Sequence, residues 1–366
     1  MRPGRIAWLL VAAYAALAVI AVFPSTAAQR RDGRAAAQAA QQAKPLDAYA
    51  ADVDKAIDGG LKYLAGQQTA NGSFARGGED SSAVTSLCIM AFLAKGYTPG
   101  VGPYGAVINK GVDFVLQHVQ NTGVLFGVQL GSGPMYDHSI STLLLSEVSG
   151  MVDPDRQKRI DAVLPRALEI ILAAQRVKKP PIHQGGWRYH PSSDDSDISC
   201  TGWPLMALRS ARNNGSAVPA DAIAEGIKFV MNCRTQDGGF AYQPGSGPGV
   251  ARTGTALLCL ELTGHHGEDV TTKAGDWILA HPQRNQGEEF FYYGLYYCAQ
   301  GMFQLGGDYW DKFAHHMYDT VLDLQKTDGS WPQGGGSESQ PGTCYATAMS
   351  ILALSVPYAQ LPIYQR

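Results

Sequence analysis

Three aspartates, Asp194, Asp195 and Asp197, form the densest acidic cluster of the chain. They follow a glycine-aromatic turn at Gly185 to Trp187 and precede an apolar run. When carboxyl groups lie close together behind apolar walls, the pKa of one of them rises, so that it keeps its proton and can act as an acid. If this protein catalyses a reaction, we expect the reaction here. The structural alternative is that these side chains cap the helix that follows them.

Aromatic side chains flank the acidic cluster. Trp187, Tyr189 and Trp203 lie on either side of it, and a second aromatic segment, residues 290–297, places tyrosines at helical spacing. Ring faces stabilise cations without attacking them, so such rings suit a site in which positive charge develops. The alternative for each ring is packing between neighbouring elements of the core.

The elements that position these residues belong to an internal repeat. Its unit is a helix, a turn with a glycine and an aromatic residue, and a second, more apolar helix. The turns Gln68 to Phe74 and Gln325 to Trp331 share the spacing QxxxGxF/W, and four looser copies lie between them. These copies include Gly123 to Phe126, Gln175 to Trp187, Gln236 to Phe240 and Glu288 to Phe291. Six copies predict about twelve helices.

The two helices of each unit differ in pattern. First helices such as Ile57–Gln68 and Ile223–Cys233 have one apolar side, which is typical of an outer layer. The second helices are apolar nearly all round, which is typical of an inner layer: Ser82–Ala94, Ser139–Val148, Thr253–Leu262 and Ala346–Val356. We therefore predict an all-α fold, an (α/α)6 toroid of six helical hairpins. An open superhelical solenoid is the alternative.

In such a toroid, the inner helices all begin at the same end of the barrel, which is its mouth. The residues at these junctions are Glu79, Asp80, Asp137, His138, Asp195, Asp197, Arg252, Thr253, Tyr292, Tyr293, Cys344 and Tyr345. From these and from the aromatic groups we predict six residues of a binding site: His138, Trp187, Tyr189, Trp203, Arg252 and Tyr293. His138 can tune Asp197 if the two face each other, and a helix-capping or surface role is its alternative.

Residues 51 to about 358 resemble the superfamily of squalene-hopene cyclases, oxidosqualene cyclases and protein prenyltransferase β-subunits, because those proteins carry QxxxGxW turns. The closest resemblance is to single-domain bacterial members with prenyltransferase and squalene oxidase repeats. It implies an α/α toroid. It also implies an apolar isoprenoid or lipid as the ligand.

Class II cyclases of that superfamily carry a DxDD acidic motif, which Asp195-Ser196-Asp197-Ile198 resembles. The resemblance implies that Asp197 is the proton donor and Asp195 its partner acid in a proton-initiated cyclisation of an isoprenoid. Ile198 replaces the second aspartate of the pair. Pro204 adds a constraint, because proline disrupts a helix interior. Either the helix begins near Trp203, or it begins at Asp197 and bends.

We expect neither a metal nor an organic cofactor. Prenyltransferase β-subunits bind zinc through Asp, Cys and His, but Gly342 stands where their histidine would be. The adjacent pairs His265-His266 and His315-His316 point in different directions on a helix and make poor joint ligands.

Two other functions stay open. The first is a non-catalytic toroid that binds a lipid or a protein, since class II cyclases close their cavity between two helical domains and this chain has length for one. The second is a polysaccharide-acting α/α barrel. Nucleic acid is not expected as a partner, because the formal net charge is -3 and the chain has no long basic run.

The N-terminal residues 1–28 resemble a signal peptide. Arg2 and Arg5 precede the apolar run Ile6–Phe23, and small residues follow it. An uncleaved membrane anchor is the alternative, because the run is nearly long enough to cross a bilayer. Either way we expect an exported or membrane-anchored protein, with an Ala/Gln-rich linker over 29–50 and one toroid domain over 51–366.

Overall fold

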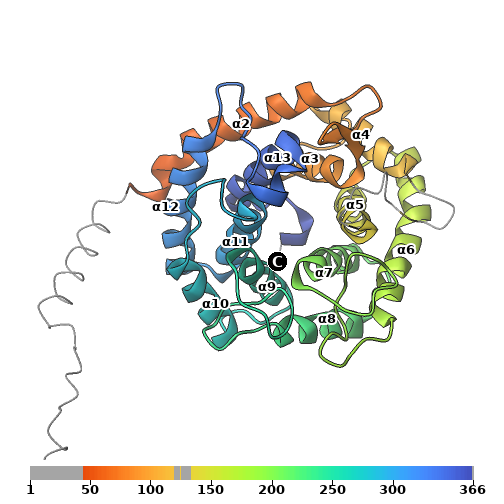
Figure 1. Ribbon diagram of the computed structural model, residues 1–366. Coiled ribbons are helices and arrows are strands. Elements are labelled where there is room, and N and C mark those ends of the chain that lie inside the picture. Colours follow the sequence, from red (N-terminus) through yellow and green to blue (C-terminus); the bar gives the residue numbers. More distant parts are fainter. Residues whose placement is uncertain (1–43, 119–123, 125–132, 365–366) are drawn as a thin grey trace, which may run out of the picture. The chain divides into compact units, whose positions relative to one another are not determined.

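Twelve α-helices in two concentric layers dominate the part of the chain that the computed structural model describes, residues 44–118, 124 and 133–364 (Figure 1). The inner layer consists of α3 (Ser82–Ala94), α5 (Pro134–Val148), α7 (Ile198–Asn213), α9 (Val250–Leu262), α11 (Phe291–Leu305) and α13 (Gly342–Leu354). The outer layer consists of α2 (Ala50–Gln67), α4 (Gly105–Gln117), α6 (Pro154–Arg176), α8 (Ala220–Asn232), α10 (Asp269–Ala280) and α12 (Gly307–Leu324). The sequence prediction of outer and inner helices in alternation is confirmed.

The inner helices close into a ring. Each packs against the next around the barrel, and α13 completes the circle by packing against α3 (Figure 1). Outer helix α12 likewise packs against α2. The structure is therefore a closed toroid and not an open solenoid. Every residue of α3 is buried, as its continuous apolar pattern predicts.

The glutamine of the turn motif joins neighbouring repeats. Its side-chain amide donates one hydrogen bond to a carbonyl of its own turn and a second to the next outer helix. Gln68 reaches Val107 in α4 at 2.9 Å, and Gln175 reaches Ala222 in α8 at 2.7 Å. Gln325 reaches forward to α2 in the same way, so the motif also closes the ring.

The glycine and the aromatic residue of the motif have equally definite roles. Gly185 has a φ of 92°, and a Cβ there would collide with the Glu225 carbonyl of α8. Trp187 is wedged between the layers: its backbone N–H bonds the Thr201 hydroxyl of α7 and its indole N–H bonds the Ile171 carbonyl of α6. We call this place, between an outer helix, its inner helix and the next outer helix, the wedge position.

Short elements lie at the two ends of the barrel. Strands β1 (Phe74–Arg76) and β2 (Glu79–Ser81) form an antiparallel hairpin in the first turn, with Phe74 opposite Ser81. Four 3-10 helices complete the described elements: η1 (Leu46–Tyr49), η2 (Gly336–Ser339), η3 (Val356–Tyr358) and η4 (Pro362–Tyr364).

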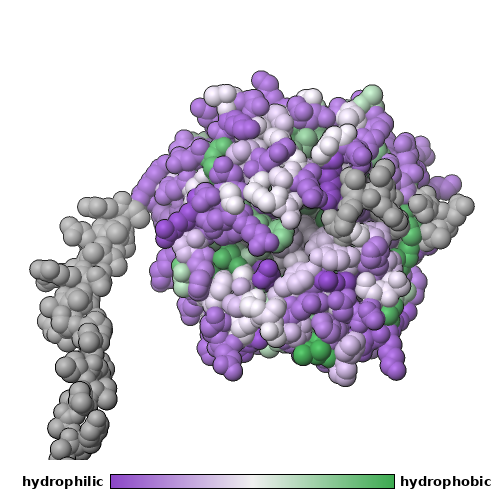
Figure 2. Space-filling view, in the orientation of Figure 1, coloured by the Kyte–Doolittle hydropathy of each residue, from purple (hydrophilic) through white to green (hydrophobic). Residues whose placement is uncertain are grey.

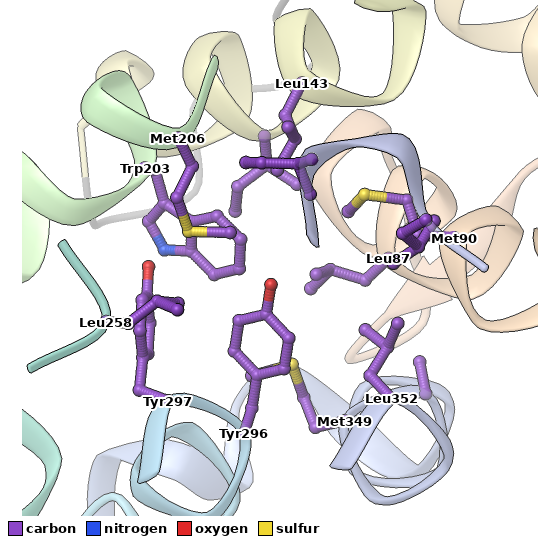
Figure 3. Close-up of a cluster of buried hydrophobic side chains, with 14 of the residues drawn as sticks. Leu87, Met90, Leu143, Trp203, Met206, Leu258, Tyr296, Tyr297, Met349 and Leu352 are labelled. Carbon is purple, nitrogen blue, oxygen red and sulfur yellow. The ribbon is translucent and has the colours of Figure 1, made fainter. Parts of the chain in front are cut away.

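The inside of the barrel is filled over part of its depth. Figure 3 shows side chains from the inner helices pointing toward one another, among them Leu87, Met90, Leu143, Trp203, Met206, Tyr296 and Met349. At the end away from the turns, η4 packs against α7, and the hydroxyls of Tyr296 and Tyr364 bond each other at 2.6 Å. We call this the closed end and the end with the turns the mouth.

The compact unit begins at Leu46, and the predicted signal segment lies outside the described residues. Among the helices of the described residues, none has the length and apolar content that crossing a bilayer requires.

Candidate functional site in the centre of the toroid

A cavity of about 680 Å³ opens at the mouth, on the axis of the ring. Figure 2 shows the surface hollowed near the centre of this face, where less hydrophilic side chains replace the strongly hydrophilic ones of the periphery. The lining includes Arg76, Ala83, Val84, Leu87, Tyr136, Ile140, Tyr189, Ser199, Trp203, Tyr242, Arg252, Glu289, Phe290, Tyr293, Glu338 and Tyr345. We call it the central cavity. All six inner helices or the turns that lead to them contribute to it.

Two positions of the repeat supply most of the wall. The residue two places after the turn aromatic lines the cavity in three repeats, as Arg76, Tyr189 and Tyr242. The first turns of the inner helices supply the rest. Deeper in, aliphatic side chains such as Leu87 and Ile140 form the floor beside Trp203. The cavity therefore grades from an aromatic and charged rim to an apolar base.

Asp197 is the N-cap of α7, and its side chain is fully buried. One carboxylate oxygen accepts the backbone N–H of Cys200 at 2.8 Å, and the other accepts Nη1 of Arg188 at 2.8 Å. Burial raises the pKa of Asp197 above its ordinary value, while the Cys200 N–H and the Arg188 guanidinium oppose that rise. The helix begins at Ile198, directly after Asp197, and includes Pro204, so it does not begin near Trp203.

Arg188 connects the two predicted catalytic acids. Its Nε lies 3.2 Å from an oxygen of Asp195, whose side chain is 38% exposed, while Nη1 bonds buried Asp197. Gln243 donates a second hydrogen bond to Asp195 at 3.0 Å. The two carboxylates therefore share a cation, and the charge of that cation opposes protonation of the buried Asp197.

Arg188 also connects Asp197 to the central cavity. Its Nη1 donates to the Tyr242 hydroxyl at 2.6 Å, and its guanidinium lies 4.5 Å from the ring centre of Tyr189. The hydroxyls of Tyr189 and Tyr242 bond each other, and both tyrosines line the cavity. Asp197 itself stands behind this pair and does not form part of the lining.

Two further buried carboxylates hold the starts of inner helices at the mouth. Glu338, from η2, accepts the backbone N–H groups of Tyr292 and Tyr293 at 3.0 and 2.8 Å, so it caps α11. Asp137, from α5, accepts the N–H of Ala83 at the start of α3. Burial raises the pKa of both carboxyls. Alternate inner helices, α3, α7 and α11, thus have an acidic cap.

The structure brings together four of the eight residues predicted from sequence. Tyr189, Trp203, Arg252 and Tyr293 line the central cavity. Asp195 and Asp197 lie behind its wall, joined through Arg188.

The other two predicted residues face the outer layer. Trp187 occupies the wedge position. His138 is fully buried and its Nε2 lies 2.9 Å from the Ala167 carbonyl of α6, so it points away from Asp197 and from the cavity. Burial lowers the pKa of His138 to about 4, which keeps the ring neutral. Their position on the inner helices and turns was predictable, but the direction of each side chain was not.

The prediction from sequence did not include several residues that line the cavity. Tyr242 follows Phe240 at the spacing by which Tyr189 follows Trp187, and Arg76 follows Phe74 in the same way. Comparing the repeats at this position would have found all three. Glu338 gives no such signal, because it reaches α11 from the following repeat.

A different buried acid lies at the closed end. Glu147, on α5, is fully buried; it accepts the Ser210 hydroxyl and, at 3.3 Å, the N–H of Ile363. Burial raises its pKa to about 7, since only neutral donors oppose the rise. All six cysteines are buried free thiols. Within the described residues, no three His, Cys, Asp or Glu side chains come close enough together to hold a metal ion.

Comparison with known proteins defines the class of this fold. Residues 189–362 match the prenyltransferase alpha-alpha toroid domain, which agrees with the toroid fold of the structure. No curated protein sequence matches the chain.

Solved structures support the same assignment. The type II terpene cyclase MstE from Scytonema, in its apo form, aligns with a TM-score of 0.53 and 13% identity over 85% of this chain and 99% of its own. A variant of MstE in complex with geranylgeranyl dihydroxybenzoate, its substrate, aligns with a TM-score of 0.57 and 13% identity, covering 85% and 98%. A glycosidase aligns with a TM-score of 0.56 and 14% identity, covering 83% and 96%. At these identities the likeness establishes the toroid fold alone.

Proposed function

We propose that the central cavity binds an isoprenoid or another ligand with a long apolar part. The observation that carries this proposal is the gradient within the cavity, from charged and aromatic residues at the rim to Leu87, Ile140 and Trp203 at the base. A volume of about 680 Å³ lies within the range of pockets that enclose most of a small organic ligand. A related toroid, the MstE variant, is in complex with a geranylgeranyl compound.

The rim suits a polar or anionic head group. Arg76, from the first turn, and Arg252, from the start of α9, both line the cavity, and Arg252 forms no ion pair with an acid among the described residues. Glu338 also lines the rim, but the N–H groups of α11 and the Tyr345 hydroxyl occupy its oxygens. The apolar tail then lies against the base of the cavity, where burial of its surface drives binding.

We further propose a specific reaction in this cavity: proton-initiated cyclisation, with Asp197 as the general acid and Asp195 as its partner. Burial of Asp197 and its raised pKa support it. Arg188 and the pair Tyr189–Tyr242 lie between Asp197 and the cavity, and a guanidinium cannot accept a proton, so Asp197 must donate to the substrate directly. Because Arg188 favours the carboxylate form, this chemistry requires the guanidinium to move toward Asp195 when ligand enters.

Binding is tested on the full-length protein with squalene and geranylgeranyl diphosphate as probes. Retained lipid is extracted after gel filtration and measured by mass spectrometry. We expect retention by the wild type and loss in Ser199→Trp, since Ser199 lies at the wall and a larger ring there fills the cavity. Leu322→Trp, on outer helix α12, is the matched control and should retain lipid. Equal retention by both variants contradicts the proposal.

Catalysis is tested separately by product analysis. Cyclic products in the wild type, and their loss in Asp197→Asn with lipid retention unchanged, would support the general-acid role. Turnover unchanged in Asp197→Asn excludes that role. Retention without product in the wild type assigns the toroid to ligand binding alone.

We also propose that the apolar run Ile6–Phe23 exports or anchors the protein, so that the toroid works outside the cytoplasm. N-terminal sequencing of protein from fractionated cells tests this. A mature N-terminus near Ala28 indicates cleavage, and recovery of the intact chain in the cytoplasm contradicts export.

A further inference from the structure

The wedge position is filled by an aromatic side chain in four of the turns that the structure describes. Phe74, Trp187, Phe240 and Trp331 are each buried, and each donates its backbone N–H to a threonine of its own inner helix. The rings of the two tryptophans reach the next outer helix, where Gly226 and Gly60 leave room for them. These rings are therefore part of the contact between layers.

The fifth turn, between α10 and α11, lacks this ring. Only ten residues, 281–290, connect the two helices, and Phe290 at its end lines the central cavity instead. The threonine is missing too. It stands four residues after the N-cap in α3, α7 and α9, and Gly294 takes this place in α11.

A cavity of about 330 Å³ lies at this wedge position. Its walls are the three elements that hold the tryptophans elsewhere: the end of an outer helix, the start of its inner helix and the middle of the next outer helix. They supply Ile278 and Leu279 from α10, Phe291, Gly294, Leu295 and Cys298 from α11, and Phe313, His316, Met317 and Thr320 from α12. We call it the side pocket.

We propose that the side pocket binds a planar aromatic molecule of one or two fused rings, in the place where other repeats insert their own ring. The size fits, because an apolar cavity of about 150 Å³ is enough to bind benzene. The walls are predominantly apolar, and an indole occupies the corresponding place in two other turns, as Trp187 and Trp331.

The polar groups of the pocket are consistent with a neutral ligand, because Lys312, the cation of the lining, lies 3.7 Å from a carboxylate oxygen of Asp308. His316 Nε2 lies 2.6 Å from the Gln283 carbonyl, and His281 Nδ1 lies 2.8 Å from the Trp277 carbonyl, so both rings are already engaged. Leu279 stands four residues before Gln283, as Ile171 stands before Gln175. The Ile171 carbonyl accepts the Trp187 indole N–H, which makes the Leu279 carbonyl the corresponding acceptor for a ligand N–H.

Indole is the probe, and the full-length protein is the sample. We expect indole to raise the thermal unfolding midpoint saturably, because it binds the folded state alone. Thr320→Trp places a ring at the pocket edge and should weaken indole binding by about tenfold or more. Leu322→Trp, two residues further along α12 and outside the pocket, is the matched control and should bind like the wild type. Ser199→Trp, in the central cavity, should also bind like the wild type.

A second measurement does not depend on the variants. Nuclear Overhauser effects from indole protons to the methyl groups of Met317 and Leu279 are expected in the wild type. The proposal is overturned if indole gives no saturable shift, if Ser199→Trp abolishes the shift while Thr320→Trp keeps it, or if the contacts fall on central-cavity residues.

Discussion

Asp197 at the mouth and Glu147 at the closed end are both fully buried carboxyls on the inner ring, but their surroundings differ in charge. Asp197 bonds a guanidinium and a helix N-terminus, whereas Glu147 bonds a hydroxyl and one backbone N–H. Burial raises the pKa of each, and Glu147 reaches about 7. Burial is common to both sites, so the difference lies in what opposes the rise in pKa: a guanidinium at Asp197 and neutral donors at Glu147.

The two acids differ in how well each could act as a general acid. A general acid must keep its proton until substrate arrives. Burial favours the protonated form of Glu147, but Glu147 lies at the end of the barrel that side chains fill. Asp197 lies next to the central cavity but shares Arg188 with Asp195. Four measurements test whether charge pairing explains the difference.

The largest effect is expected from Arg188→Met. This change leaves Asp197 buried and unpaired, which should lower the free energy of unfolding by about 3–5 kcal/mol at neutral pH. Denaturant unfolding measures it. Arg209→Met is the control, since Arg209 is half-buried and forms no ion pair in the described structure; its loss should stay below about 1 kcal/mol. A loss for Arg188→Met that does not shrink at acidic pH, where Asp197 gains a proton, would contradict the explanation.

The next effect concerns Glu147→Gln and has a defined pH window. Because the folded pKa of Glu147 is about 7 and the ordinary value is 4.5, the folded state binds more protons between these values. The contribution of Glu147 to the free energy of unfolding is therefore largest below about pH 4.5. It decreases by up to about 3 kcal/mol as the pH rises to 7. Glu147→Gln should remove that slope.

The slope must be taken as the difference between wild type and variant. His138 contributes the opposite slope, because its lowered pKa removes stability as pH falls from about 6.5 to 4. A difference in unfolding free energy that stays constant from pH 4.5 to 7 would show that Glu147 titrates normally.

Asp197→Asn should cost about 1–3 kcal/mol, since an amide still caps α7 but no longer neutralises Arg188. The double variant with Arg188→Met separates the two contributions. If Asp197 and Arg188 act as a pair, the double loss is smaller than the sum of the single losses by at least about 1 kcal/mol. Additive losses would mean that the pair contributes nothing beyond its separate groups.

The smallest effect is expected from Asp195→Asn. The side chain is 38% exposed, and ion pairs in contact with solvent contribute below about 1 kcal/mol. Its loss should also fade at high salt, whereas that of Arg188→Met should persist. A salt-insensitive loss of several kcal/mol would make Asp195 the dominant partner of Arg188.

The sequence predicts the toroid well because its repeat encodes local contacts. Gln68 and Gln325 stand in the first and the last turn of the toroid and make the same two kinds of bond, one within their turn and one to the next outer helix. Spacing alone reveals such a motif. The N-cap role of Asp197 was similarly within reach, since capping depends on the residues next to it.

The site was less predictable because it depends on contacts between repeats. Glu338 caps α11 from a 3-10 helix and stands 46 residues from Tyr292 in the sequence. No local sequence pattern predicts this contact. His138 and Tyr136 are two residues apart on α5, yet one faces α6 and the other the central cavity. On a helix that is buried nearly all round, sequence periodicity does not tell the two faces apart.

Ring closure has a consequence for how the molecule opens. Gln325 donates to the Ala56 carbonyl at 2.7 Å, so the sixth repeat holds the first in the way that each repeat holds the next. In a linear array, the end repeats have one neighbour and fray before the middle. A ring has no end repeat. Amide hydrogen exchange should therefore protect α3 and α13 as strongly as α7 and α9, with one concerted opening in place of a gradient along the chain.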